Sequence, residues 1–449
     1  VIFGINSFTP EGRGGHVAVI VNDTIYFMGG SLKVSDENLI KKKYPTRGYN
    51  LSDEVFSLDL TSSFSRDNPP FIDLSGGTSR MLYGSVKGTA VLGGAGRGDV
   101  YLVGGTLQNL TLLDQIDHNE TISNESLMLN ELINTWNVTD RDNKELNIFV
   151  YRPTAQSWKI PDIKGGPPIR RRSTSTVISQ NGTIYIFGGR AEHDTGSPDL
   201  ILFNDTYIYN TVTPGWNKIN ASNAPSARSH STATLLPNGK ILYIGGVYQD
   251  RPREDAKPIE MNDISVFDTN SLTWSSKACI PIQARIGHTA TLTPDNNAII
   301  IIGGTSNATT ANPVFIMLDI RTEPYEYSEL KDSGIRPPTL AYHTVNLYQN
   351  FMIVAFGNIT NDNSGSVKTN PSIYLLCLPR LEWVTTFTPD YTCPIIPNPP
   401  IPLIIGSTVA FYVVFIATTV AIIKINRQSL LDNKLMIIAN CSIALIALL

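Results

Sequence analysis

A hairpin pattern that recurs six times along the chain constrains its fold more than any other feature. Each copy has an apolar strand, a turn, a second apolar strand and then adjacent glycines, as in "ARSHSTATLLPNGKILYIGG" at residues 227–246. Asn-Gly turns in the third and fourth copies favour tight hairpins, because both residues tolerate positive φ. The glycine pairs are Gly29-Gly30, Gly104-Gly105, Gly188-Gly189, Gly245-Gly246 and Gly303-Gly304, and we expect Gly357-Asn358 to replace the pair in the sixth copy.

A second pair of strands follows each glycine pair. In four copies it ends in tryptophan, namely Trp158, Trp216, Trp274 and Trp383. The order of elements resembles the kelch repeat over about residues 11–390: a strand, a turn, a second strand, Gly-Gly, then a Tyr/Phe strand and a Trp strand. The resemblance implies a β-propeller with one four-stranded sheet per repeat. We expect an all-β, six-bladed propeller, with a seventh blade inside the longer first intervals as the less favoured alternative.

The repeated glycines and tryptophans are predicted to be structural. Glycine permits close backbone approach and unusual φ/ψ where the second strand ends near a crowded centre. Tryptophan on the outer strand supplies apolar mass between blades. Trp136 lies outside the repeat, and we therefore predict it as a ligand contact.

Four histidines precede their glycines by a similar number of residues: His16, His230, His288 and His343. We interpret them as one position of the repeat, with a shared packing role and not a single asymmetric site. The chain contains no HExxH, CxxC or GxSxG motif. We therefore expect no catalytic residue, no metal and no cofactor.

An enzymatic alternative comes from the same resemblance, because kelch-like propellers also carry the copper-radical enzyme galactose oxidase. That site needs two histidines and two tyrosines, one of them cross-linked to cysteine. Tyr342-His343 is similar to the Tyr-His pair of such a strand, but no histidine follows His343. A copper-radical oxidase, or another carbohydrate-active enzyme, is the alternative to a non-enzymatic module.

A long apolar stretch near the end of the chain predicts a membrane anchor. Residues 401–423 contain no charge, and ~20 apolar residues suffice to cross a hydrocarbon core. Lys424 and Arg427 follow, which predicts a cytoplasmic C-terminal side. We predict a transmembrane helix over 403–425 in the lipid bilayer, a Pro-rich stalk over 391–402 and a juxtamembrane tail over 426–449. A truncated second apolar segment is the alternative interpretation of that tail. Residues 1–10 are expected to be a leader or signal-peptide remnant.

Sequons and cysteines fit a single-pass protein whose N-terminal domain, residues 11–390, is extracellular or lumenal. Cys377 and Cys393 flank the last strand pair, and a disulfide between them would fasten the end of the propeller. The candidate glycosylation sites all precede the apolar stretch: Asn22, Asn50, Asn109, Asn119, Asn124, Asn137, Asn181, Asn204, Asn220, Asn307 and Asn358.

The insertions after the glycine pairs are expected to meet on one face, where a rigid scaffold usually carries function. Arginines concentrate there, and we predict a patch for carboxylate or phosphate groups, with mutual charge screening as the alternative. The patch comprises Arg170, Arg171, Arg172, Arg190, Arg251 and Arg253. Lys+Arg 35 against Asp+Glu 39 argues against nucleic-acid binding. We predict a membrane-anchored module that binds a protein or glycan in an adhesion or receptor-like role.

Overall fold

The computed structural model describes residues 8–32, 50–117, 134–135, 148–161, 164–361 and 368–389. The chain divides into two units, Val1–Cys393 and Pro394–Leu449, and the second lies outside the described residues. The described elements are mainly strands. They also include the helix α2 (Leu110–Asp117) and the 3-10 helices η1 (Gly77–Ser79), η2 (His193–Thr195) and η3 (Leu378–Arg380).

Six antiparallel sheets, which we call blades 1 to 6, follow one another along the described chain. In each blade four strands pair in sequence order, from the inner to the outer edge. Blade 1 consists of β2 (Val17–Val21), β3 (Thr24–Met28), β6 (Val55–Asp59) and β8 (Phe71–Asp73). Blade 2 consists of β10 (Thr89–Gly93), β11 (Asp99–Val103), β13 (Ile148–Arg152) and β14 (Ser157–Lys159). Blade 3 consists of β15 (Ser175–Ile178), β16 (Thr183–Phe187), β19 (Thr206–Asn210) and β20 (Gly215–Ile219).

Blade 4 consists of β22 (Thr232–Leu235), β23 (Lys240–Ile244), β26 (Asp263–Asp268) and β27 (Thr273–Ala278). Blade 5 consists of β28 (Thr289–Leu292), β29 (Ala298–Ile302), β32 (Phe315–Asp319) and β33 (Glu326–Glu329). Blade 6 consists of β36 (Thr344–Tyr348), β37 (Phe351–Ala355), β40 (Ile373–Cys377) and β41 (Glu382–Val384). A short parallel strand, β34 (Ser333–Gly334), is added to the outer edge of blade 6.

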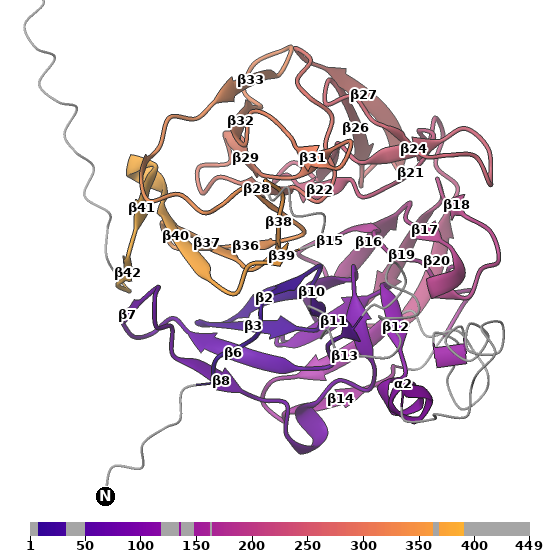
Figure 1. Cartoon of the computed structure of the whole chain (residues 1–449). Coiled ribbons are helices and arrows are strands. Elements are labelled where there is room, and N and C mark those ends of the chain that lie inside the picture. Colours follow the sequence, from indigo (N-terminus) through magenta and orange to yellow (C-terminus); the bar gives the residue numbers. More distant parts are fainter. Residues whose placement is uncertain are drawn as a thin grey trace, which may run out of the picture. The chain divides into compact units, whose positions relative to one another are not determined.

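The blades form a closed ring (Figure 1). Each inner strand lies beside the next, in the order β2, β10, β15, β22, β28 and β36, and β36 lies beside β2. Backbone hydrogen bonds repeat this closure at the end of every second strand, where an N–H donates to a carbonyl of the next blade. The donor and acceptor residues are Gly30 and Ser85, Gly105 and Arg171, Gly189 and Arg228, Gly246 and Arg285, Gly304 and Leu340, and Gly357 and Arg13. The last of these bonds joins blade 6 to blade 1.

The same contact explains the first glycine of each pair. A Cβ on Gly303, whose φ is +68°, would lie 2.1 Å from the Leu340 carbonyl oxygen of the next blade. The structure corrects the assignment in blade 6, where Phe356 (φ +56°) takes the first position and Gly357 (φ +97°) the second. Phe356 is tolerated because its ring is fully buried and packs edge-on to Phe27.

Apolar side chains fill the space between neighbouring blades. In β29 all five residues are buried, as expected for a strand covered on both faces. Trp216, Trp274 and Trp383 are buried, and Trp158 is half-buried with its indole N–H donating to the Ser79 carbonyl at 2.8 Å. The tryptophans therefore pack within the propeller.

An additional two-stranded sheet joins the last described residues to blade 1. Strand β42 (Thr386–Phe387) pairs with β7 (Phe64–Ser65). The Phe64 and Phe387 rings stack with centroids 4.9 Å apart, and Phe387 is fully buried. Residues far apart in the sequence thus fasten blade 6 to blade 1.

Short strands flank the glycine pairs and form a small sheet above each blade; we call these six sheets the crown. Because each crown strand lies just before an inner strand or after a glycine pair, all of them emerge at one end of the ring. They are β1 (Arg13–Gly14), β4 (Ser31–Leu32), β5 (Asn50–Leu51), β9 (Gly84–Val86), β12 (Thr106–Gln108), β17 (Arg190–Ala191), β18 (Ile201–Leu202), β21 (Ala227–Ser229), β24 (Val247–Gln249), β25 (Lys257–Pro258), β30 (Thr305–Ser306), β31 (Thr309–Thr310), β35 (Leu340–Ala341), β38 (Asn358–Ile359) and β39 (Lys368–Thr369).

The prediction of a single-pass membrane protein is corrected. Within the described ranges, no helix is both long and apolar enough to cross a membrane. A span needs about 20 helical residues, whereas α2 has eight. The predicted span at 403–425, with its stalk and tail, lies outside the described residues.

Candidate functional site

A cavity of ≈ 170 Å³ lies on the propeller axis at the crown end. Every blade contributes the residue two positions before its inner strand, and we call these six residues the axial ring. They are Gly15, Lys87, Ser173, His230, Gly287 and Tyr342. All six have positive φ, between +53° and +68°.

Backbone hydrogen bonds hold the axial ring in this conformation. The N–H of one ring residue donates to the carbonyl of the ring residue in the preceding blade, so that side chains at these positions line the cavity. The donor and acceptor pairs are Gly15 and Tyr342 (2.8 Å), Lys87 and Gly15 (2.8 Å), Ser173 and Lys87 (2.9 Å), His230 and Ser173 (3.1 Å), and Tyr342 and Gly287 (2.7 Å).

The histidines do not share one position, which corrects the sequence interpretation. His16, His288 and His343 immediately precede their inner strands, whereas His230 stands one residue earlier and belongs to the axial ring. The first three each place Nε2 near a threonine Oγ1 of the preceding blade, at 2.9, 3.4 and 3.1 Å. Their Nδ1 atoms are buried and have no hydrogen-bond partner within the part of the chain that the structure describes. Burial lowers the pKa of His288 to about 3 and that of His343 to about 4.

His230 instead has a polar contact at each ring nitrogen. Its Nε2 lies 3.1 Å from Ser173 Oγ and its Nδ1 lies 3.0 Å from Ser229 Oγ. Burial, followed by the positive charges of Lys87, Arg190 and Arg172, holds the pKa of His230 well below its usual value. His230 is therefore a neutral imidazole in this environment.

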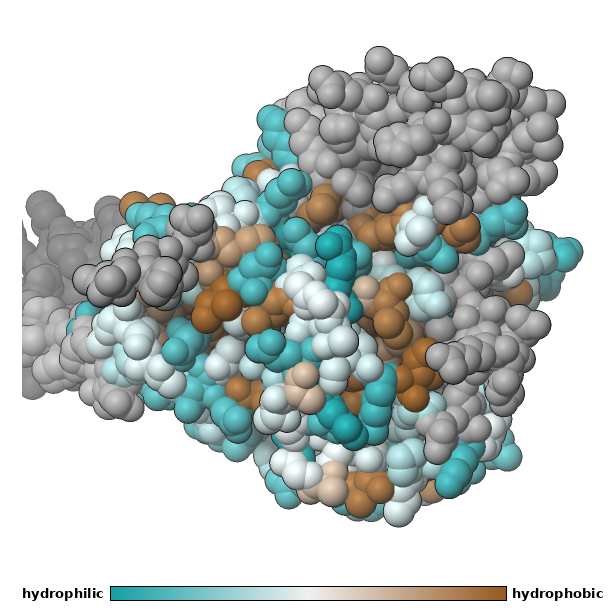
Figure 2. All heavy atoms as spheres, turned by 90° about the horizontal axis from the view of Figure 1, so that it is seen from below, coloured by the Kyte–Doolittle hydropathy of each residue, from teal (hydrophilic) through white to brown (hydrophobic). Residues whose placement is uncertain are grey.

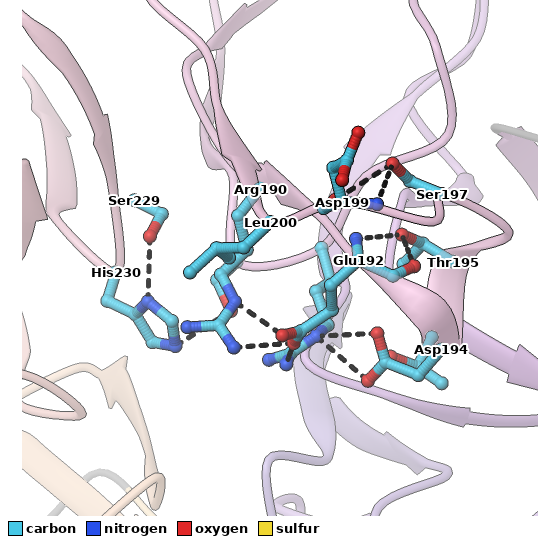
Figure 3. Close-up of polar contacts among 12 residues, drawn as sticks. Arg190, Glu192, Asp194, Thr195, Ser197, Asp199, Leu200, Ser229 and His230 are labelled. Carbon is cyan, nitrogen blue, oxygen red and sulfur yellow. Dashed lines mark hydrogen bonds and ion pairs between the residues drawn. The ribbon is translucent and has the colours of Figure 1, made fainter. Parts of the chain in front are cut away.

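A charged cluster from blade 3 lies beside His230 (Figure 3). The Arg190 guanidinium faces the His230 ring on one side and Glu192 on the other. Arg190 Nη2 is 2.5 Å from Glu192 Oε1, and Arg172 pairs with both Glu192 and Asp194. Asp194 is fixed by the buried Thr106 hydroxyl of β12, which donates to it at 3.0 Å. One guanidinium nitrogen of Arg172, Nη1, is buried and finds no hydrogen-bond partner among the residues that the structure describes.

Lys87 is the axial-ring residue with a cationic side chain. Its Nζ lies 5.0 Å from the centroid of the Tyr342 ring, across the cavity. Among the described residues it forms no ion pair, since the nearby carboxylates bind Arg172 and Arg190. Desolvation, reinforced by Arg172 and Arg190, lowers the pKa of Lys87 to about 7.

The arginines predicted as ligand contacts separate into three groups. Arg172 and Arg190 meet beside the cavity, whereas Arg253 is exposed and pairs with Asp199 at 2.8 Å; Arg251 is exposed as well. Arg170 is buried, and its Nε donates to the Thr195 carbonyl at 3.3 Å. Trp136 lies outside the described residues.

Arg171 proves to be a repeated structural residue that sequence reasoning missed. Arg13, Arg171 and Arg285 each donate from Nη1 to the carbonyl of the first glycine in their blade, at 3.1 Å. Arg228, in the same place, donates to Ser265 Oγ at 2.9 Å. All four precede their glycine pair by a similar number of residues, and that spacing was the available signal.

The remaining predicted sites are a cysteine pair and the sequon asparagines. Cys377 is disulfide-bonded, while its predicted partner Cys393 lies outside the described residues, as do Asn119, Asn124 and Asn137. Asn109 and Asn358 are half-buried, and Asn50 begins β5. The exposed sequon asparagines are Asn22, Asn181, Asn204, Asn220 and Asn307. The described residues contain no group of three or more His, Cys, Asp or Glu side chains that could hold a metal ion.

Comparison with known proteins agrees with this architecture. A family model, the KLHDC2/KLHL20/DRC7 Kelch-repeats domain, matches residues 133–283. Kelch domain-containing protein 1 of Homo sapiens is 24% identical over 356 residues, which cover 70% of this chain and 82% of that protein. The Mus musculus protein of the same name is 27% identical over 188 residues, covering 40% of this chain, and the chain spans only 42% of its length.

Two further matches extend the comparison. N-acetylneuraminate epimerase of Pasteurella multocida is 31% identical over 93 residues, which cover 20% of this chain and 23% of the enzyme. A solved structure titled "Structure of YjhT" superposes with a TM-score of 0.50 at 14% identity, over 71% of this chain and 84% of that one. The sequence matches support a relationship to kelch-repeat proteins, and the structural match supports the propeller fold alone.

Proposed function

We propose that this chain is a protein-interaction module built on a six-bladed propeller, with the partner bound across the crown. Kelch-repeat domains are generally protein-interaction modules. The presence of the crown is the observation that most directly supports the proposal. Six small sheets stand at one end of the ring on a rigid base, the arrangement that suits a binding face.

The outer flank offers less to a partner. On the side seen in Figure 2, hydrophobic residues occur as small separate patches among hydrophilic ones. Large continuous apolar patches mark interaction surfaces, and scattered apolar residues do not. Binding across the crown is therefore favoured over binding along this flank.

Site-specific photo-crosslinking on the full chain tests the proposal. Arg253, in the crown between β24 and β25, would be replaced by a photoreactive phenylalanine analogue. Arg321 is the matched control, because it is an exposed arginine paired with an aspartate in the turn between β32 and β33, at the opposite end of the ring. We expect a discrete crosslinked protein from position 253 only. Equal yields from both positions, or none from position 253, would refute binding across the crown.

The epimerase match suggests a second function, action on a carboxylated sugar in the axial cavity. The positive charges beside the cavity suit a carboxylate. The volume of ≈ 170 Å³ is small beside the ~300 Å³ or more of typical pockets for larger ligands, and this favours the interaction module. Turnover of N-acetylneuraminate anomers by the purified chain, measured by NMR, would reverse that preference.

A further inference from the structure

We propose that the axial cavity binds a small free oxyanion, a carboxylate or phosphate, with the ammonium of Lys87 as its main contact. This site is independent of partner binding across the crown. Four observations support it: the backbone conformation of the axial ring, the charges around the cavity, its size, and its position on the axis.

Glycine and larger residues occupy equivalent positions of the axial ring, so their backbone conformations can be compared directly. Gly15 and Gly287 adopt the left-handed conformation without strain, and they show that glycine satisfies the fold at this position. Lys87, His230 and Tyr342 hold the same conformation at a conformational cost, with φ of +58°, +61° and +57°. Strained residues of this kind concentrate at ligand-binding sites. All three line the cavity, and we infer that their side chains are kept for what they contact there.

The charges around the cavity leave a positive surplus. Lys87 forms no ion pair among the described residues, and Arg172 keeps one buried guanidinium nitrogen without a partner. Glu192 and Asp194 are the carboxylates in contact with Arg172. Other titratable groups that line the cavity have pKa values that leave them neutral near pH 7, namely His16, His288 and His343. Below about pH 7, where Lys87 is protonated, an anion would therefore meet uncompensated positive charge in a partly desolvated site.

The hydroxyl and imidazole groups beside Lys87 suit an oxyanion. Ser173 Oγ and His230 Nε2 lie 3.1 Å apart; when Nε2–H donates to Ser173 Oγ, the hydroxyl hydrogen of Ser173 is left to donate to an oxyanion. The cavity of ≈ 170 Å³ resembles in size the ~150 Å³ space that holds one benzene molecule. Inorganic phosphate or a short carboxylic acid fits that volume, whereas a nucleotide exceeds it.

Calorimetric titration of the full chain with sodium phosphate, and separately with sodium malonate, distinguishes phosphate from carboxylate as the bound anion. The test variant is Lys87→Gly, because glycine already occupies this ring position in blades 1 and 5. We expect one anion to bind with 1:1 stoichiometry, and Lys87→Gly to weaken it by at least about tenfold while thermal stability stays equal or rises. A misfolded variant would instead show lowered stability.

Arg97→Gly is the matched control. Arg97 is an exposed cation with φ +51° in the turn between β10 and β11 of the same blade, away from the cavity. It should bind the anion like the unmodified chain. Binding should also weaken as the pH rises above about 7, because the Lys87 amine loses its proton. The proposal is overturned if neither anion binds at millimolar concentration, or if Lys87→Gly binds with unchanged affinity.

Discussion

Histidine occupies two neighbouring positions at the crown end of the inner strands, and its role differs between them. His343 and its two equivalents pack between blades with one nitrogen near a threonine hydroxyl. His230, one residue earlier in its repeat, lies in the axial ring between two serine hydroxyls. A shift of one residue moves the imidazole from an inter-blade contact to the wall of a cavity.

The packed histidines predict acid sensitivity. In the folded chain the pKa of His343 is lowered to about 4, so below pH 6.5 the unfolded state binds more protons and the free energy of unfolding falls as the pH decreases. The full contribution of His343 is roughly 3 kcal/mol. Urea unfolding across this pH range should show that the free energy of unfolding falls less at acidic pH for His343→Gln than for the parent chain. An identical pH profile for variant and parent would contradict the assignment.

At the scale of the repeated element, blades 1, 3, 4 and 5 each combine a glycine pair with a buried arginine. In blades 1 and 3 the arginine also meets a carboxylate: Arg13 Nη2 lies 2.6 Å from Glu54, and Arg171 Nη1 lies 2.5 Å from Asp205. Both acids accept the N–H of the first glycine through their backbone carbonyls, and Val314 does so in blade 5. Arg285 of blade 5 therefore lacks a counter-charge among the described residues, where its Nη2 has no hydrogen-bond partner. Burial lowers the pKa of Arg285 to about 10.

Supplying the missing carboxylate should stabilise blade 5. Val314→Asp places an acid where Asp205 stands in blade 3, beside the buried Arg285 guanidinium. A hydrogen bond to a charged group contributes about 1.5–3 kcal/mol. We expect an increase of that order in the free energy of unfolding, measured with guanidinium chloride, and a much smaller one for the neutral control Val314→Asn. Equal effects of the two substitutions would argue against charge pairing.

At the scale of the whole molecule, the ring depends on a seam between residues distant in sequence. Gly357 donates its N–H to the Arg13 carbonyl at 2.7 Å, and β42 pairs with β7. Elsewhere, each blade packs against sequence neighbours, as in other repeat proteins. At the seam the first blade meets the last, and β2 there lies beside β36.

Removing the seam's aromatic contact should open this junction selectively. Phe387→Ala deletes a fully buried ring, and such a change costs about 3–5 kcal/mol. Hydrogen exchange should accelerate in β7, β8, β40 and β41. Phe267→Ala, which deletes an equally buried ring in blade 4, should cost a similar amount without exposing the seam. Uniform exchange in both variants would mean that the ring opens as one unit.

The repeated hairpins can be recognised in the sequence because their signals are local. Asn-Gly turns, glycine pairs and outer-strand tryptophans each occupy a few consecutive residues, and together they indicate a kelch-like propeller. They did not locate the site. The spacing from histidine to glycine varies by a residue or two between copies, and that variation hid the difference between His230 and His343.

Only the tertiary structure decided which residues surround the axis and which charges are compensated. Arg171 and Arg172 are adjacent in sequence, yet one supports a glycine pair and the other meets Glu192 and Asp194 beside the cavity. Lys87 comes from a different blade. Such partners meet through ring closure and loop folding, which are long-range consequences of packing six sheets around one axis. Local sequence patterns do not specify the distances between residues of different blades. Burial and charge at the axis depend entirely on those distances.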